Sequence, residues 1–130
     1  MIERNPAFYL HCFSPTEIHA LSDITGIDTE SLLSQLKEAG LDSIPGGGGE
    51  ILVDIIRKRR RSSCGADDWL NISATANRLG IPTTATMMIG LGEADWMRAE
   101  HLQRVREVQD ETEGFISFIP WTFQPDNTPL

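Results

Sequence analysis

The sequence predicts an α/β fold in which short apolar strands alternate with amphipathic helices. Four β-type runs are separated by stretches whose apolar residues recur every three to four positions. Glycine or proline stands at most junctions between them. Alternation of this kind gives a parallel sheet with right-handed crossovers, either a doubly wound sheet or a piece of a β/α barrel. A complete barrel needs about 250 residues, so a barrel of 130 residues would be a partial one.

The first strand is expected at residues 8–13, an apolar and aromatic run. The four residues that follow, Ser14 to Glu17, are typical of a capping box with proline at the first helical position. This start predicts a helix that ends at Gly26, and a second helical stripe ends at Gly40. The two helices together make one crossover.

The second strand is expected at residues 41–44, before Pro45 and four consecutive glycines. Glu50 is expected to begin the next helix. We expect the basic run at residues 57–61 to be a solvated helix end, where cations complement the helix dipole. The inward face of this helix should comprise Ile51, Leu52, Ile55 and Ile56.

The second half of the chain repeats the alternation. A helix capped by Asp67 or Asp68 should end at Gly80, and residues 83–89 form the strongest strand signal, β-branched at the start and apolar at the end. A long helix then leads to a last strand at residues 115–119. The buried face of that helix should comprise Met97, Leu102, Val105 and Val108.

Charge and cysteine content restrict the classes of function. The chain has 11 basic and 19 acidic residues, a net charge of −8, which argues against nucleic acid or an anionic membrane as the main partner. No apolar run approaches the roughly 18 residues of a membrane span, and the N-terminus has no apolar signal core. Cys12 and Cys64 are too few for a disulfide scaffold or a metal motif. We therefore expect a cytoplasmic protein with reduced thiols, no metal ligands of its own, and a small-molecule or protein partner.

The ends of the predicted strands gather the candidate functional residues. In a doubly wound sheet and in a barrel alike, the site lies at the carboxyl ends of the strands. This places on one rim His11, Cys12, Ser14, Gly46 to Glu50, Gly90 to Glu93, and Trp121 to Gln124.

The glycine quartet before Glu50 is the most informative of these features. Residues without Cβ let a ligand approach the backbone, and amides at a helix start bind anions. The quartet fits neither Walker A nor the dinucleotide fingerprint, because Glu50 and Ile51 stand where those patterns need other residues. A flexible turn is the simpler alternative. Glu50 itself either complements a helix dipole or accepts hydrogen bonds from ribose hydroxyls.

Two further rim residues also have two interpretations each. His11 is either a satisfied core histidine or a proton carrier. Glu93 is either a loop carboxylate that caps the next helix or a second carboxylate that faces the ligand.

Six segments resemble a known family: 10–18 (LHCFSPTEI), 40–48 (GLDSIPGGG), 50–52 (EIL), 83–88 (TTATMM), 109–112 (QDET) and 118–125 (FIPWTFQP). Together they are similar to radical S-adenosylmethionine (SAM) enzymes of the dehypoxanthine futalosine cyclase type, from the futalosine route to menaquinone. Aminofutalosine synthase and the second subunit of the deazaflavin FO synthase share this frame. The resemblance covers nearly the whole chain.

The resemblance implies that residues 1–130 form one incomplete segment, truncated at both ends, that corresponds to about strands 3 to 6 of a radical SAM barrel. In that family, Cys-x3-Cys-x2-Cys holds a four-iron four-sulfur (4Fe–4S) cluster whose open iron binds SAM. This chain lacks the motif, and two separate thiols cannot replace it. We therefore expect a fragment that is inactive alone, with a chain that carries the missing barrel strands as its partner.

The resemblance also implies residue roles. The SAM contacts are expected to be Gly46, Gly47, Gly48, Gly49, Glu50 and Glu93. The substrate-facing residues are expected to be His11, Ser14, Glu17, Trp121 and Gln124. Leu91 departs from the family, which usually has histidine there. We expect Met87, Met88, Phe118 and Trp121 to form an apolar wall.

The reaction implied is reductive cleavage of SAM, hydrogen abstraction from the ribose of a nucleoside-like substrate, and closure of a spiro ring. A non-catalytic nucleotide-binding or interaction module, which would use the glycine quartet without a cluster, is the alternative from a different class of function.

Overall fold

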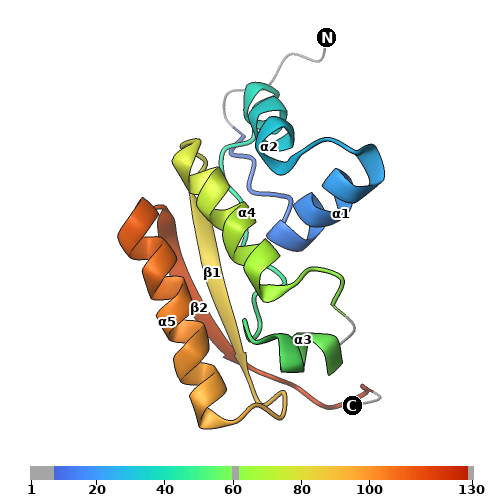
Figure 1. The fold of residues 1–130 in the computed structure, drawn as a ribbon, viewed down its shortest axis with the longest axis vertical. Coiled ribbons are helices and arrows are strands. Elements are labelled where there is room, and N and C mark those ends of the chain that lie inside the picture. The colour runs from blue at the N-terminus through green and yellow to red at the C-terminus, as the bar shows by residue number, and fades with distance from the viewer. Residues whose placement is uncertain (1–7, 60–61, 129–130) are drawn as a thin grey trace.

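The computed structural model describes residues 8–59 and 62–128 and confirms the α/β class. The elements in this part of the chain are α1 Pro15–Thr25, α2 Thr29–Glu38, α3 Asp54–Arg59, α4 Ala66–Arg78, β1 Thr83–Ile89, α5 Asp95–Thr112 and β2 Phe115–Thr122. Strands β1 and β2 run side by side along the molecule, and α4 and α5 lie against one face of them (Figure 1). Barrel geometry beyond this two-stranded sheet remains a prediction.

The parallel pair β1–β2 is the regular part of the sheet. β1 has the predicted bounds, whereas β2 extends through Pro120 to Thr122, three residues beyond the prediction. The amide of Phe123 donates to the Ile89 carbonyl, so alternate residues before it face β1 and Pro120 faces the outer edge. A proline is tolerated there because its missing N–H removes no bond to β1.

The two strands predicted in the first half of the chain are wrong in extent. Residues 8–13 and 41–44 form only isolated parallel bridges, His11 with Ser43 and Ile44 with Thr83. Pro45 ends the second run, because it has no amide to donate. The aromatic side chains that begin the first run, Phe8 and Tyr9, are exposed. The bridges still place residues 41–44 next to β1 and residues 8–13 next to residues 41–44.

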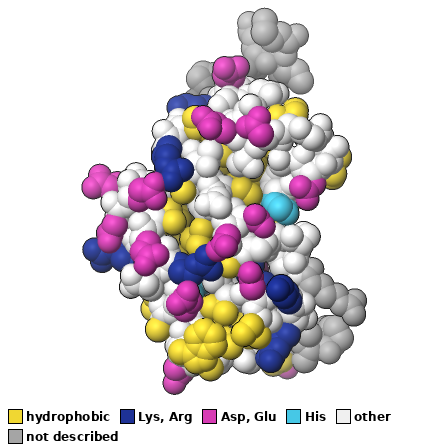
Figure 2. All heavy atoms as spheres, viewed as in Figure 1, with side chains coloured by type: hydrophobic (Ala, Val, Ile, Leu, Met, Phe, Trp, Pro, Cys, Tyr) yellow, Lys and Arg dark blue, Asp and Glu magenta, His cyan; other side chains and the backbone are white. Residues whose placement is uncertain are grey.

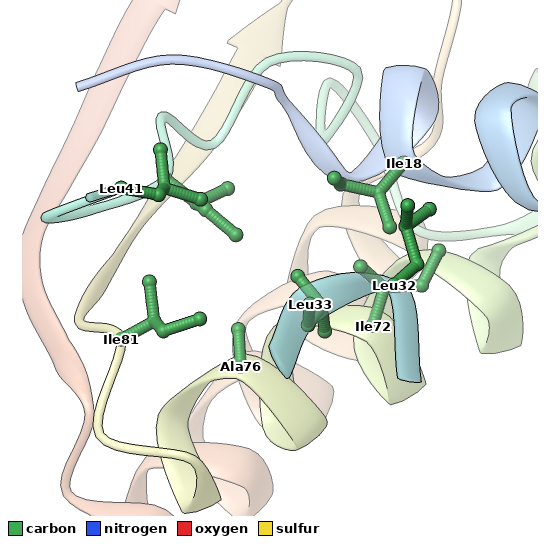
Figure 3. Close-up of a cluster of buried hydrophobic side chains, with 8 residues drawn as sticks. Ile18, Leu32, Leu33, Leu41, Ile72, Ala76 and Ile81 are labelled. Carbon is green, nitrogen blue, oxygen red and sulfur yellow. The ribbon is translucent and has the colours of Figure 1, made fainter. Parts of the chain in front are cut away.

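Helices α1, α2 and α4 enclose the largest apolar cluster (Figure 3). The capping box predicted at Ser14 is present, and Gly26 ends α1 in the left-handed conformation. Helix α4 begins after Gly65 and not at Asp67 or Asp68, because Asp68 accepts the Gly65 amide from the first turn. The side chains that point toward one another in this cluster include Ile18, Leu32, Leu33, Leu41, Ile72, Ala76 and Ile81.

The predicted face of α5 is partly wrong. Met97 and Val105 are buried, but Leu102 is 47% exposed. His101 takes its place, because it lies four residues from both Met97 and Val105 and so shares their helix face.

The helix after the glycines differs most from prediction. Residues 50–53 are not helical, and α3 begins only at Asp54. Ile55 is consequently exposed, against expectation. The predicted solvated basic end is wrong at Arg57, which is 4% exposed; Lys58 and Arg59 are exposed as expected, and Arg60 and Arg61 lie outside the described residues.

The face of the molecule that α4 and α5 form carries charges of both signs. Acidic and basic side chains are interspersed over the face that α4 and α5 form (Figure 2). Among the described helices, none combines the length and apolar character needed to cross a bilayer.

Candidate functional site

The loops at the carboxyl ends of the strand-like segments lie in order along one edge. A Cβ on Gly47 would stand 3.1 Å from the Ser14 Cβ. The Met88 amide donates to the Glu50 carbonyl (2.9 Å), and the Phe123 amide donates to the Ile89 carbonyl (2.8 Å). The structure therefore brings the predicted rim segments together, from the start of α1 to the residues after β2.

The glycine quartet forms a tight turn and does not begin a helix. The Gly49 amide donates to the Gly46 carbonyl at 3.2 Å, and Gly48 has φ of +79°. A bonded four-residue turn with a positive φ at its third residue is a type II turn, which requires glycine there. Helix-dipole complementarity for Glu50, one of the two interpretations above, is excluded because no helix begins at that residue.

The turn is packed tightly against β1. The Gly46 amide donates to Thr84 Oγ1 (2.8 Å), and Thr86 Oγ1 donates to the Gly46 carbonyl (2.5 Å). A Cβ on Gly46 would overlap the Thr84 carbonyl oxygen, and one on Gly49 would stand 2.6 Å from Thr86 Oγ1. Close packing thus accounts for glycine at two of the four positions.

Two buried side chains to which the sequence assigned no role in the site hold the turn from the protein side. Trp69 Nε1 donates to the Gly47 carbonyl (3.1 Å), and Arg57 Nη1 donates to the Gly48 carbonyl (2.8 Å). Arg57 also donates twice to the Cys64 carbonyl, at 2.7 and 2.9 Å. Arginine in a run of five basic residues carries no sequence signal for burial, so only the fold reveals this role.

Glu50 lies beside a small hollow next to the turn. Its carboxylate is 4.0 Å from the Arg57 guanidinium. Burial raises the pKa of Glu50, and the positive charge of Arg57 opposes that rise. The hollow has a volume of about 190 Å³, which fits part of a nucleoside but is below the 300–1,000 Å³ of whole-ligand pockets. Its lining comprises Glu50, Ile51, Ile56, Arg57, Ser62, Met88 and Leu91.

The Glu93 carboxylate accepts hydrogen bonds from backbone amides of its own loop. Its carboxylate accepts the amides of Gly90 (2.9 Å) and Leu91 (2.7 Å) and pairs with Arg98 at 2.8 Å. Burial acts to raise the pKa of Glu93, but these hydrogen bonds outweigh it and lower the pKa to about 2. The carboxylate therefore holds the loop after β1, and among the described residues no amide of α5 donates a hydrogen bond to it.

His11 is paired with a neighbouring strand-like segment. Its Nδ1 lies 2.6 Å from Ser43 Oγ, and the two residues also form a parallel bridge. Ser43 is fully buried whereas His11 is exposed. The histidine is consequently not a core residue.

The remaining predicted substrate residues are placed as follows. Ser14 donates to Glu17 through its amide (2.8 Å) and its hydroxyl (2.7 Å), and these bonds lower the pKa of Glu17. Trp121 is 53% exposed. Gln124 Nε2 donates to Thr122 Oγ1 at 3.1 Å. Ser14 and Glu17 thus hold the start of α1, and the other two lie exposed after or near the end of β2.

The predicted apolar wall is wrong in part, because side chains alternate across a strand. Met87 packs against α5 and the residues before α3, and Phe118 contacts the His101 ring at 6.2 Å between centroids. Met88 and Trp121 are register partners on the opposite face of the sheet. Only these last two can line a cavity on that face.

His101 is a buried polar group that the sequence did not single out. Its Nδ1 accepts the Leu52 amide at 3.1 Å, while its Nε2 has no hydrogen-bond partner among the described residues. Burial first, and the charge of Arg57 second, lower its pKa to about 4. The ring is neutral at pH 7 and fastens α5 to the segment after the glycine turn.

The two cysteines do not fit an iron–sulfur cluster. Cys64 is buried in an apolar cluster, and burial raises the pKa of its thiol. Cys12 packs at the edge of a different apolar cluster. A cluster needs several close thiolates, and within residues 8–59 and 62–128 no three His, Cys, Asp or Glu side chains gather as metal ligands. The glycine turn with Glu50 fits an adenosyl group better, since the turn has two amides without a partner among the described residues and the Glu50 carboxylate lines a hollow.

Comparison with known proteins gives matches over nearly the whole chain, although no family model matches it. Cyclic dehypoxanthine futalosine synthase of Halalkalibacterium halodurans is 47% identical over 129 residues, 98% of this chain and 35% of that protein. Aminodeoxyfutalosine synthase of Thermus thermophilus is 45% identical over the same shares. The 5-amino-6-(D-ribitylamino)uracil–L-tyrosine 4-hydroxyphenyl transferase 1 of Methanosarcina barkeri is 43% identical over 96% of this chain and 34% of its own length.

The chain thus spans about 35% of the length of the curated relatives it matches. The matches confirm the resemblance that the six sequence segments carry. Over nearly its whole length the chain is therefore similar to about a third of two radical SAM enzymes, cyclic dehypoxanthine futalosine synthase and aminodeoxyfutalosine synthase.

Proposed function

We propose that this chain is a SAM-binding segment of an enzyme of the cyclase type, which converts dehypoxanthine futalosine to its cyclic product in menaquinone biosynthesis. The observation that carries the proposal is the 47% identity to cyclic dehypoxanthine futalosine synthase across 98% of the chain. Aminodeoxyfutalosine synthase, at 45% identity, supplies the second candidate, since both proteins' names point to futalosine-type nucleosides.

In this proposal the glycine turn and Glu50 contact SAM. The Gly47 and Gly48 amides make no hydrogen bond among the described residues, and the Glu50 carboxylate, which follows the turn, borders the hollow that Arg57 also lines. Amide donors next to a carboxylate suit the oxygens and hydroxyls of a ribose. Glu93 supports the side of the site where adenine binds, because its carboxylate holds the loop after β1. It does so through the hydrogen bonds that it accepts from the Gly90 and Leu91 amides.

The substrate side of the proposed site is the exposed face near His11, Ser14 and Trp121. SAM with a reduced 4Fe–4S cluster supplies the radical chemistry in this family. The described residues of this chain would bind and orient the nucleoside and keep water out, with Met88 and Trp121 as the apolar part. His11, held by Ser43, presents a ring nitrogen that can donate or accept one proton.

The cluster ligands and the remaining sheet must then come from residues other than those described. We propose a partner, or further chain, that pairs with the outer edge of β2. That strand carries exposed apolar side chains on both faces, as an uncovered sheet edge does. These side chains are Ile116, Phe118, Ile119 and Trp121. Size-exclusion chromatography of the chain alone tests this: association or aggregation is expected, and a stable monomer contradicts it. Two free thiols, Cys12 and Cys64, are in keeping with a cytoplasmic location.

Calorimetric titration with S-adenosylhomocysteine tests the SAM site directly. We expect the chain to bind, and Glu50→Gln to weaken binding about tenfold, the cost of about one charged hydrogen bond. Glu100→Gln, on the exposed face of α5, removes the same charge and should leave affinity unchanged. Absence of binding by the unaltered chain, or an equal loss in both variants, would contradict the proposed site. Binding of dehypoxanthine futalosine separates the cyclase from the second candidate.

A further inference from the structure

The central peptide of the glycine turn is a point where two conformations compete. Type I and type II turns share the same hydrogen bond between their first and fourth residues, but differ by a flip of the peptide between the second and third. Here that peptide joins Gly47 to Gly48. Glycine at both positions makes either orientation sterically accessible, so the turn sequence by itself does not select one.

Trp69 selects the orientation that is observed. Its indole Nε1 donates to the Gly47 carbonyl at 3.1 Å from α4, and the indole is fully buried. A flip would turn that carbonyl away from Trp69 and leave the buried indole N–H unpaired, at a cost in free energy. Stacking on Phe115 of β2, with centroids 6.2 Å apart, fixes the ring itself.

Arg57 holds the next carbonyl in the same way. Its guanidinium is fastened to the Cys64 carbonyl by two bonds, and a third N–H reaches the Gly48 carbonyl. Three successive carbonyls of the turn, from Gly46 to Gly48, are therefore occupied by donors of the protein interior.

The amide directions follow from the planar trans peptide. Each N–H points opposite to the carbonyl of the preceding residue, and no peptide of the described chain is cis. The Gly48 N–H therefore points away from Trp69, and the Gly47 N–H away from Thr86. Neither amide has a hydrogen-bond partner within the described residues, whereas the Gly49 amide closes the turn.

We propose that Trp69 and Arg57 are positioning residues of the ligand site, which lock the glycine turn so that the Gly47 and Gly48 amides face the ligand. The pair of amides takes an oxygen acceptor, a hydroxyl or carboxylate oxygen of the adenosyl ligand. This inference rests on the proposed function for the identity of the ligand. The lock itself is a property of the turn and can be measured without a ligand.

The test compares Trp69→Phe with Trp96→Phe in glycine-labelled protein by NMR. Trp69→Phe keeps an aromatic ring and removes the N–H that selects the orientation, so the Gly47 and Gly48 signals should broaden or double. Trp96 is 55% exposed on α5, and its variant should leave these signals sharp and single. Unchanged glycine signals in Trp69→Phe would overturn the lock. If that variant does not fold, Arg57→Lys, which keeps the charge but not all the bonds, is measured in its place.

Titration with S-adenosylhomocysteine gives the second readout. If the competent orientation falls to about a tenth of the population, the apparent affinity falls about tenfold. Trp96→Phe should bind as the unaltered chain does. A flipped turn that binds with unchanged affinity would overturn the role in ligand positioning. Failure of the unaltered chain to bind would instead count against the proposed function, and the NMR comparison would still decide whether Trp69 locks the turn.

Discussion

Two glycine-containing loops lie on the same rim. Glu50 follows the first loop, and Glu93 ends the second. The hydrogen bonds of their backbone groups are made in opposite ways. In the turn at residues 46–49, buried donors occupy the carbonyls and two amides have no partner among the described residues. In the loop at residues 90–93, the Glu93 carboxylate occupies the amides. The first loop therefore still has donors to offer, whereas the second supplies its own anion.

The two glutamates show the same contrast in their electrostatics. Burial raises the pKa of Glu50, which lies 4.0 Å from its cation. Hydrogen bonds lower the pKa of Glu93 to about 2 despite burial. A carboxylate with an incomplete set of partners is suited to binding, and one with a complete set is suited to holding a loop.

Replacement of Arg57 should produce the largest change, because the first loop depends on it. Arg57→Met leaves the carbonyls of Gly48 and Cys64 without their buried donor. We expect the free energy of unfolding to fall by about 4 kcal/mol, measured by urea denaturation. Lys58→Met, at the exposed neighbouring position, should change it by less than about 0.5 kcal/mol. Similar losses in the two variants would mean that the first loop does not depend on buried donors.

Replacement of glycine by alanine should destabilise the two loops to different extents, because the space around the added methyl group differs. On Gly46 it would overlap the Thr84 carbonyl oxygen of β1, and backbone cannot move aside easily. We expect Gly46→Ala to lower the free energy of unfolding by about 3 kcal/mol. At Gly92, with φ of +87° and no atom within 4 Å, alanine should cost only about 1 kcal/mol of backbone strain. Thermal unfolding of both variants measures the difference, and a larger loss at Gly92 would reverse the comparison.

The sequence correctly predicted where several helices and strands begin and end. The capping box at Ser14, the end of α1 at Gly26 and the bounds of β1 all follow from local residue preferences. The rim was predicted too, since parallel strand-like segments bring their carboxyl ends to one edge. Local patterns suffice wherever the structure is decided within a few residues of the chain.

The parts that sequence reasoning missed depend on partners outside their own helix. Arg57 is buried because carbonyls nine and seven residues away accept its N–H groups. His101 is buried because the Leu52 amide, 49 residues away, donates to it. Charge and helical periodicity assign such side chains to solvent or leave them unnoticed, since neither pattern contains the position of a distant carbonyl or amide.

Loss of the Glu93 charge should affect the second loop by a smaller and pH-dependent amount. Because the pKa of Glu93 is about 2 in the folded chain and 4.5 ordinarily, its stabilisation is complete above about pH 4.5 and is lost as the pH falls toward 2. Glu93→Gln should lower the free energy of unfolding at pH 7 by about 2 kcal/mol. It should also make stability depend less steeply on pH between 4.5 and 2.

The control for this prediction is Asp95→Asn, which touches the same Arg98 at 3.2 Å but is 98% exposed. Its effect should be below about 0.5 kcal/mol, because exposed ion pairs contribute little. Urea denaturation at a series of pH values measures both variants. An unchanged acid dependence in Glu93→Gln would show that the loop does not rely on its own carboxylate, and the difference between the two loops would then not be electrostatic. Affinity for S-adenosylhomocysteine should fall less in Glu93→Gln than in Glu50→Gln, since the second loop acts only through its shape.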